Sequence, residues 1–179
     1  MTQSVRSILP DSQPVAGEPC LADWQLNFLL RKLSIRRNEQ VLVYGQPDRD
    51  VLTTLAGSVS EQGSVVILEE DDRIAFVDQM AQQYPQIERR RTGPSSAPQQ
   101  CDVVVVLPNR VNEPFEPLLD QAWRRLRSGG RILLALPESD DNSAVLHRLM
   151  EQARKRGFVS RYRRCCDKHC AWVGVKYGN

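Results

Sequence analysis

The sequence predicts one α/β domain built on a doubly wound, mostly parallel sheet of seven strands that ends in a β-hairpin. Short apolar runs alternate along the chain with stretches in which apolar residues recur at helical period. Four consecutive valines, Val103 to Val106, are typical of a central parallel strand that is covered on both faces. The last two apolar runs have no helical stretch between them, so we expect them to pair as an antiparallel hairpin.

The individual elements follow from this periodicity. Asp23 suits the N-cap of a first helix, whose apolar residues run from Trp24 to Leu33. Further helices are predicted at residues 48–62, 71–83, 114–127 and 142–156. Strands are predicted at residues 41–44, 64–69, 87–91, 102–107, 131–136, 159–164 and 171–177. Glycines are expected to end three of the helices, at Gly63, Ser128-Gly129-Gly130 and Gly157.

The domain organisation is simple. The chain has 179 residues, a length that suits one domain with a full core. Residues 1–20 are rich in Pro, Ser and Gly and show no periodicity, which predicts a flexible N-terminal arm. Residues 21–179 make the predicted α/β domain.

Charge is distributed unevenly. The net charge is only +2, but the chain from Arg148 onward holds nine basic residues against two acidic ones, a net +7. The acidic residues gather instead at residues 69–72 and 138–141. This asymmetry predicts one basic face.

The sequence also indicates the cellular compartment and the redox state of the cysteines. No apolar run approaches the roughly 20 residues of a membrane span, and the N-terminus lacks a signal pattern. We therefore expect a soluble, cytoplasmic protein. The five cysteines, an odd number with three of them clustered, fit reduced thiols better than a disulfide framework.

The segment from Val41 to Arg49 opens a Rossmann-like βαβ unit. An apolar strand runs into Gly45 and then into a helix. In a nucleotide site of this type, two more glycines would follow and let the backbone approach the ligand. Their places hold Pro47 and Arg49, and Pro47 also removes an N–H group and fixes its φ angle.

The chain resembles the class I S-adenosylmethionine-dependent methyltransferases from about Trp24 to Tyr177. The run Arg125 to Leu134 is similar to the family segment L-x-P-G-G-x-L-L that leads into its fifth strand. The resemblance implies that Gly45 is the first glycine of the cofactor loop. It also implies that Glu69 is the acidic residue that holds the ribose hydroxyls.

Two positions depart from the family pattern. Val43 stands where family members often carry an acidic residue in the first strand. Enzymes that methylate base amines end the fourth strand in an Asn-Pro-Pro-Tyr type motif, whereas this chain has Leu107-Pro108-Asn109-Arg110. Leu107 cannot accept hydrogen bonds from the target amine, and Asn109 lies two places too late.

This pattern resembles the degenerate N-terminal half of the bacterial ribosomal-RNA guanine-N2 methyltransferases. The resemblance implies a non-catalytic RNA-binding or scaffold domain that needs no cofactor. Its partners would be ribosomal RNA, a catalytic methyltransferase domain or a second copy of the chain. One alternative is a divergent but active enzyme that uses S-adenosylmethionine, and another is a protein-interaction module.

Each candidate residue at the cofactor site also has a structural interpretation. Gly45 and Glu69 bind the cofactor if the enzyme is active; otherwise they are a tight turn and a solvated strand end. Pro108 and Asn109 lie at the carboxyl end of a central strand, where open α/β sheets bind ligands. Asn109 could equally cap the following turn.

The C-terminal region holds the remaining candidates. Seven basic residues are predicted to contact RNA phosphates: Arg154, Lys155, Arg156, Arg161, Arg163, Arg164 and Lys168. The first three could instead only favour the C-terminal end of a helix. Arg161 and Arg163 are expected on one face of a strand, and Tyr162 and Trp172 are either stacking partners or core residues.

The last cysteines could form a zinc site or remain free thiols. Cys165, Cys166, His169 and Cys170 would complete a tetrahedral set, but neighbouring strand residues point to opposite sides. We therefore expect a hairpin turn with free thiols and no metal. His147 is expected to be a surface residue.

Overall fold

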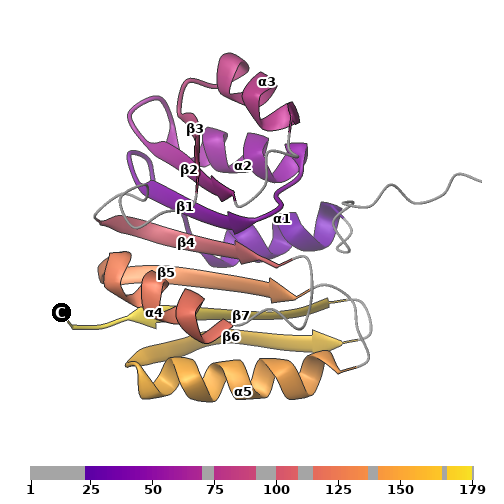
Figure 1. Ribbon diagram of the computed structural model, residues 1–179, viewed down its shortest axis with the longest axis vertical. Coiled ribbons are helices and arrows are strands. Elements are labelled where there is room, and N and C mark those ends of the chain that lie inside the picture. Colours follow the sequence, from indigo (N-terminus) through magenta and orange to yellow (C-terminus); the bar gives the residue numbers. More distant parts are fainter. Residues whose placement is uncertain are drawn as a thin grey trace, which may run out of the picture.

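The computed structural model describes residues 23–69, 75–91, 100–108, 115–136, 141–166 and 169–178. Helices and strands alternate along most of the chain (Figure 1). The helices are α1 (Asp23–Lys32), α2 (Arg49–Val59), α3 (Ala75–Gln83), α4 (Phe115–Arg125) and α5 (Asn142–Lys155). The strands are β1 (Gln40–Gly45), β2 (Ser64–Glu69), β3 (Ile87–Arg91), β4 (Cys101–Leu107), β5 (Leu126–Leu136), β6 (Phe158–Cys166) and β7 (His169–Lys176).

The strands form one seven-stranded sheet in the order β3-β2-β1-β4-β5-β7-β6. β7 runs antiparallel to both of its neighbours, β5 and β6, and every other pair of strands is parallel. The predicted doubly wound sheet with a terminal hairpin is therefore confirmed. The parallel strands and β6 all end at one edge, on the right in Figure 1, which we call the carboxyl edge.

The core has two parts, one on each face of the sheet. Helices α1, α2 and α3 cover one face, and α4 and α5 cover the other. Side chains of β1 alternate between them: Val41 and Val43 belong to the first part, and Leu42 and Tyr44 to the second. A strand that is buried on both faces reads as the continuous apolar run seen in the sequence.

The start of β5 differs from the prediction. Residues 128–130 were expected to end a helix, but α4 already ends at Arg125 and β5 begins at Leu126. The pairing with β4 passes from Cys101↔Leu126 to Val103↔Arg131, so β5 carries extra residues at a bulge. Gly129 has a φ of 80° there, which favours glycine.

The hairpin is packed by aromatic side chains. The ring of Phe158 meets Trp123 and Trp172 edge to face, with centroids 4.8 and 5.9 Å away. The indole N–H of Trp172 donates to the hydroxyl of Ser160 at 3.0 Å. Trp172 is only 2% exposed, so it is a core residue and not a stacking partner for RNA.

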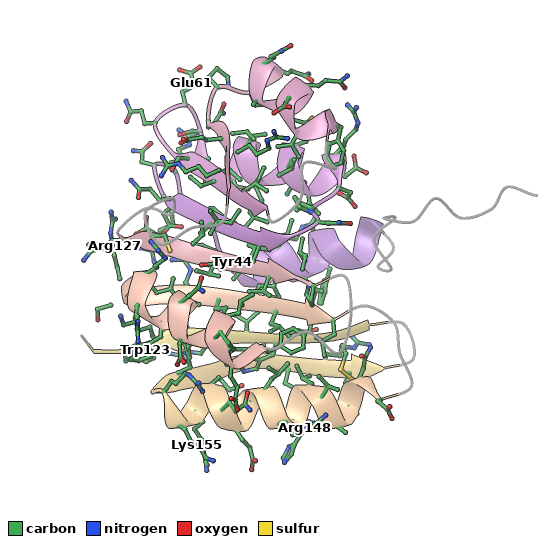
Figure 2. All side chains as sticks on the ribbon, in the orientation of Figure 1. Tyr44, Glu61, Trp123, Arg127, Arg148 and Lys155 are labelled. Carbon is green, nitrogen blue, oxygen red and sulfur yellow. A yellow bond between two sulfur atoms is a disulfide. The ribbon has the colours of Figure 1, made fainter. Side chains whose placement is uncertain are left out.

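A buried lysine joins the end of the chain to α4. The ammonium group of Lys176 donates to the backbone carbonyls of Trp123 and Leu126, both at 2.8 Å. It also lies 4.8 Å from the centre of the Trp123 ring, which is labelled in Figure 2. These carbonyls belong to the last turn of α4 and the residue after it, where a cation is favourable.

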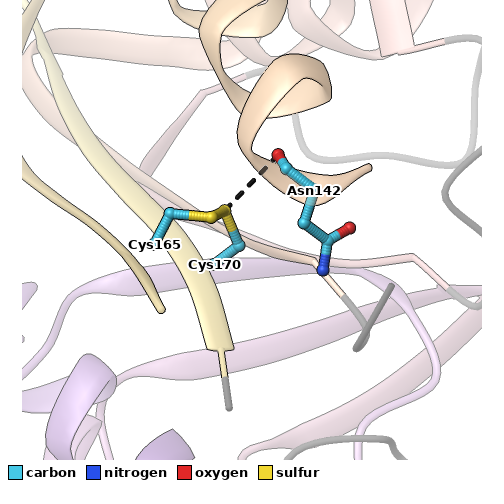
Figure 3. The surroundings of a disulfide bond; sticks show 3 residues. All are labelled: Asn142, Cys165 and Cys170. Carbon is cyan, nitrogen blue, oxygen red and sulfur yellow. Dashed lines mark hydrogen bonds between the residues drawn. A yellow bond between two sulfur atoms is a disulfide. The ribbon is translucent and has the colours of Figure 1, made fainter. Parts of the chain in front are cut away.

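The expectation of free thiols in the hairpin is wrong for two of them. A disulfide joins Cys165 to Cys170 (Figure 3). Its cause is the register, because Cys166 pairs with His169 and Cys165 therefore faces Cys170 directly. Periodicity within a single strand could not reveal this cross-strand pair.

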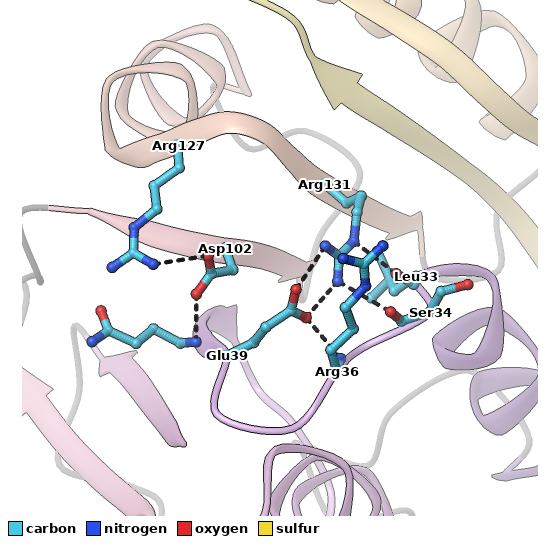
Figure 4. A network of polar contacts seen from close by, with 8 residues as sticks. Leu33, Ser34, Arg36, Glu39, Asp102, Arg127 and Arg131 are labelled. Carbon is cyan, nitrogen blue, oxygen red and sulfur yellow. Dashed lines mark hydrogen bonds and ion pairs between the residues drawn. The ribbon is translucent and has the colours of Figure 1, made fainter. Parts of the chain in front are cut away.

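A polar network ties α1 and the start of β1 to β5 (Figure 4). The guanidinium group of Arg131 binds both carboxylate oxygens of Glu39, at 2.6 and 3.0 Å. It also donates to the backbone carbonyls of Leu33 and Ser34. Nearby, Asp102 accepts from the backbone N–H of Gln40 and from Arg127.

Candidate functional site

The reversal of strand order between β1 and β4 marks the place where an open α/β sheet binds its ligand. Gly45 ends β1 there, and Pro108 follows the end of β4. Glu69 ends the neighbouring β2, opposite Arg91 of β3. The topology thus brings Gly45, Glu69 and Pro108 to the carboxyl edge. The side chain of Glu69 and all of Asn109 lie outside the described residues.

The ends of β1 and β4 approach each other closely. Gly45 has a φ of 99°, and a Cβ atom on it would lie 1.8 Å from the carbonyl oxygen of Leu107. The next N–H group, that of Gln46, donates to the same oxygen at 3.2 Å. Glycine is therefore required at position 45 by contact with β4, whether or not a ligand binds.

The N-terminus of α2 is already capped. Pro47 is buried and offers no N–H group. The carboxylate of Asp48 accepts a hydrogen bond from the backbone N–H of Val51 at 2.7 Å. The helix N-terminus, which would attract an anionic ligand, thus carries a negative side chain of its own.

Arg49 connects the helices that follow β1 and β2. Its guanidinium group donates to the side-chain oxygen of Gln79 in α3 at 2.8 Å. The same group lies 5.5 Å from the centre of the Phe76 ring. The residue that replaces a loop glycine therefore holds α2 and α3 together.

The buried titratable groups near β1 and β4 are protonated at neutral pH. Burial raises the pKa of Tyr44 to about 12, and burial also raises the pKa of Cys101 to about 12. The Tyr44 hydroxyl donates to the side-chain oxygen of Gln121 at 3.5 Å. Neither group suits proton transfer or nucleophilic attack near neutral pH.

The predicted RNA-binding residues fall into two groups. Arg154 and Lys155 are exposed at the C-terminal end of α5, and Figure 2 shows Lys155 pointing away from the body of the protein. Arg156 forms an ion pair with Asp120 of α4. The other group is on the edge strand β6, where three arginines are exposed: Arg161, Arg163 and Arg164. Lys168 lies outside the described residues.

A bulge interrupts the strand on which Arg161 and Arg163 were predicted to share a face. The pairing shifts from Ser160↔Gly174 to Tyr162↔Val173, which leaves Arg161 as the extra residue of a bulge. Arg161 lies over the ring of Tyr177, whereas Arg163 pairs with Trp172 on the face of α4 and α5. A bulge breaks the two-residue alternation on which the prediction depended.

The sequence reasoning missed a basic residue of α1. The ammonium group of Lys32 lies 4.9 Å from the centre of the Phe28 ring and 5.3 Å from that of Tyr162. This contact brings a charge from the first helix beside the basic residues of β6. The sequence does carry a signal for it, because the basic pairs 31–32 and 36–37 flank the end of α1.

No group of potential metal ligands is found among the described residues. Two of the four zinc candidates, Cys165 and Cys170, are joined to each other. His147 is exposed and lies 3.8 Å from Glu151, one turn further along α5. Within the described residues, no helix combines the length and apolarity that a membrane span requires.

Comparison with known proteins identifies the fold. No protein-family model matches the sequence, and no curated protein matches it. Among solved structures, the fibrillarin pre-rRNA processing protein of Methanococcus jannaschii is similar, with a TM-score of 0.71 and 17% identity over 91% of this chain and 78% of that one. The precorrin-6y C5,15-methyltransferase of Geobacter metallireducens has a TM-score of 0.71 and 16% identity over 94% and 97% of the two chains.

The chain has the class I methyltransferase fold. TrmN of Thermus thermophilus is a third similar structure, with a TM-score of 0.71 and 20% identity over 89% of this chain but only 50% of that one. At these identities the likeness concerns the fold alone. Within the class I methyltransferase fold, Gly45, Glu69 and Pro108 stand at the ends of the strands where the resemblance expects the cofactor loop, the ribose-binding acid and the catalytic motif.

Proposed function

We propose that this chain is a methyltransferase-fold domain that does not bind S-adenosylmethionine and acts as a non-catalytic RNA-binding domain. The observation that carries the first half is the hydrogen bond from Gln46 to Leu107, at 3.2 Å. It crosses from β1 to β4 at the point where the fold would place its ligand. The backbone N–H of Gln46 is thus already bonded within the protein, whereas in a cofactor loop it would be free to bind the ligand.

The residues after Gly45 do not fit the cofactor. Pro47 has no N–H group to offer, and the carboxylate of Asp48 already occupies a first-turn N–H of α2. Arg49 adds a positive charge to an edge that would have to hold a sulfonium cation. Pro47 and Asp48 therefore leave the carboxylate of S-adenosylmethionine without two of the N–H donors at this turn.

The end of β4 does not fit methyl transfer to a base amine. Leu107 offers no side-chain acceptor, and its backbone oxygen already accepts from Gln46. Pro108 is buried and cannot donate. A target amine would find no side-chain acceptor at either position.

The uneven distribution of charge supports the RNA-binding part of the proposal. Five of the predicted RNA-binding residues are exposed and take part in no ion pair within the described part of the chain: Arg154, Lys155, Arg161, Arg163 and Arg164. Cations of this kind neutralise phosphates and release counterions, so the affinity falls as salt rises. The resemblance to the degenerate half of ribosomal-RNA methyltransferases points the same way.

Two assays test the proposal. Incubation with S-adenosylmethionine labelled in its methyl group should leave ribosomal RNA unlabelled, while an active methyltransferase run in parallel labels its own substrate. Titration of the protein into labelled RNA should show binding that weakens as salt is raised. Incorporation of label would favour the divergent enzyme, and no binding at low salt would favour a protein-interaction module that supports a catalytic domain or a second copy.

A further inference from the structure

One face of the edge strand β6 gathers cationic and aromatic side chains. By register, Val159 pairs with Val175, Tyr162 with Val173 and Arg164 with Ala171. Cross-strand pairs share a face, and Val173 and Ala171 belong to the core under α1. Val159, Tyr162 and Arg164 therefore point to the side of the sheet that carries α1.

Two more cations join this face through aromatic rings. Tyr177 directly follows the end of β7, two residues after Val175. The guanidinium group of Arg161 lies 5.5 Å from the centre of the Tyr177 ring. Lys32 reaches the same face from α1, through its contact with Tyr162. We call these residues the α1–β6 surface: Lys32, Val159, Arg161, Tyr162, Arg164 and Tyr177.

The α1–β6 surface exposes apolar area as well as charge. Val159 is 45% exposed and Tyr177 is 49% exposed, and these are the exposed large hydrophobic side chains of the described residues. Tyr177 stays half exposed although Arg161 lies over its ring, and a half-exposed aromatic ring beside cations is an arrangement on which unpaired bases stack. Stacking between neighbouring base pairs covers the faces of bases in a duplex, so this arrangement favours a single strand.

The charges of the α1–β6 surface are available to a ligand. In the part of the chain that the structure describes, no carboxylate lies within ion-pair distance of Lys32, Arg161 or Arg164. By contrast, Arg131 and Arg156 each hold a carboxylate. Within the described residues, Lys32, Arg161 and Arg164 can therefore bind phosphate without first breaking an ion pair, whereas Arg131 and Arg156 cannot.

We propose that the α1–β6 surface binds single-stranded RNA, with a base stacked on Tyr177 and phosphates held by Lys32, Arg161 and Arg164. This rests on the proposed RNA-binding function and narrows it to one face and one class of RNA. The proposal excludes Arg154 and Lys155, at the exposed end of α5, as the main contact with RNA.

Fluorescence anisotropy with labelled RNA of about 12 nucleotides, a length that one small domain can cover, tests the proposal. The wild-type protein should bind the single strand at least several-fold more tightly than the same sequence in a duplex. Tyr177→Ala should weaken single-strand binding roughly 10-fold, while Tyr177→Phe, which keeps the ring, should leave the affinity within about 2-fold. Arg161→Ala with Arg164→Ala should lower the slope of log affinity against log salt by about 1.4.

The control removes the same charge from the other face of the sheet. Arg124→Ala with Arg148→Ala takes two exposed arginines from α4 and α5 and should leave the affinity nearly unchanged. A loss in Arg154→Ala with Lys155→Ala but none in the α1–β6 variants would overturn this inference and keep RNA binding. Equal affinity for single strand and duplex would also overturn it. Failure of the wild-type protein to bind either RNA would remove the proposed function together with the inference.

Discussion

The backbone N–H of Gln46 donates to the carbonyl oxygen of Leu107 at 3.2 Å, and this bond joins β1 to β4 at the carboxyl edge. It directly follows Gly45, which pairs with Leu107 in the sheet. The two central strands thus stay together one residue beyond the sheet, at the switch point where open α/β sheets bind their ligands. The account of this chain as a scaffold depends on that contact.

Gly45→Ala should lower the free energy of unfolding by at least about 2 kcal/mol. The new Cβ atom would lie 1.8 Å from the Leu107 oxygen, and the positive φ adds strain. Urea denaturation measures the change. Gly57→Ala is the matched control, because nothing lies within 4 Å of its Cβ position in α2, so alanine should stabilise the helix by up to about 1 kcal/mol. Equal stabilities for the two variants would contradict the close contact at Gly45.

Arg131→Met should destabilise the protein by about 2 kcal/mol or more, because it breaks a half-buried bidentate pair with Glu39. The matched control is Arg127→Met. It breaks a more exposed pair with Asp102, in which the arginine side chain is 45% exposed. Its expected cost is below about 1 kcal/mol. Urea denaturation of both variants gives the comparison, and the reverse order of the two effects would contradict the network in Figure 4.

Stability should also depend on pH through Glu39. Burial raises the pKa of this carboxyl group, but the hydrogen bonds and charges of Arg131 and Arg36 together outweigh burial and hold the pKa below its ordinary value of 4.5. A carboxyl whose pKa is lowered by folding stabilises the protein above its unfolded value, and that contribution is lost as the pH falls through the lowered pKa. The wild-type protein should therefore lose more free energy of unfolding than Arg131→Met between about pH 6 and pH 3. Parallel pH profiles would show that the pair does not set the titration of Glu39.

Lys176→Met should cost about 2 kcal/mol, since the carbonyls of Trp123 and Leu126 would lose a charged donor in a buried place. Thermal or urea unfolding gives the change. Lys155→Met is the control for loss of a lysine charge at an exposed position, and its effect should stay within about 0.5 kcal/mol. A silent Lys176→Met would mean that the lysine does not cap α4.

A disulfide between Cys165 and Cys170 should be found in the purified protein. Five cysteines less the two in this bond leave three thiols to react with Ellman's reagent after denaturation. Trypsin cuts after Arg164, Lys168 and Lys176, so a non-reduced digest should contain two peptides, residues 165–168 and 169–176, joined by the bond. Cys166→Ser should keep the link and Cys165→Ser should remove it. Five reactive thiols would restore the sequence-based expectation of a reduced hairpin.

Local patterns predicted most of the fold. The apolar runs of β1, β4 and the hairpin reflect burial that is visible within each segment, and the helical period of α2, α4 and α5 does the same. What the patterns could not predict depends on register between strands. The early start of β5, the bulge at Arg161 and the pairing of Cys165 with Cys170 are all set by a partner strand that no local period describes.

The candidate site divides in the same way. The replacement of loop glycines by Pro47 and Arg49 is visible in the sequence, but the contacts of Arg49 with Phe76 and Gln79 need the packing of α2 on α3. The net charge of +7 from Arg148 onward predicted a basic surface. The apolar pattern of α1 indicated only a core helix, so the contact of Lys32 with Tyr162 was not predicted.

Calorimetric titration with S-adenosylmethionine and S-adenosylhomocysteine tests the central claim most directly. The contact of β1 with β4 at the carboxyl edge predicts no heat of binding for either ligand at about 1 mM, a concentration at which even weak affinities near −4 kcal/mol are detected. Micromolar binding would contradict the account. It would indicate that Gly45 and Glu69 bind the cofactor and that this chain is a candidate enzyme.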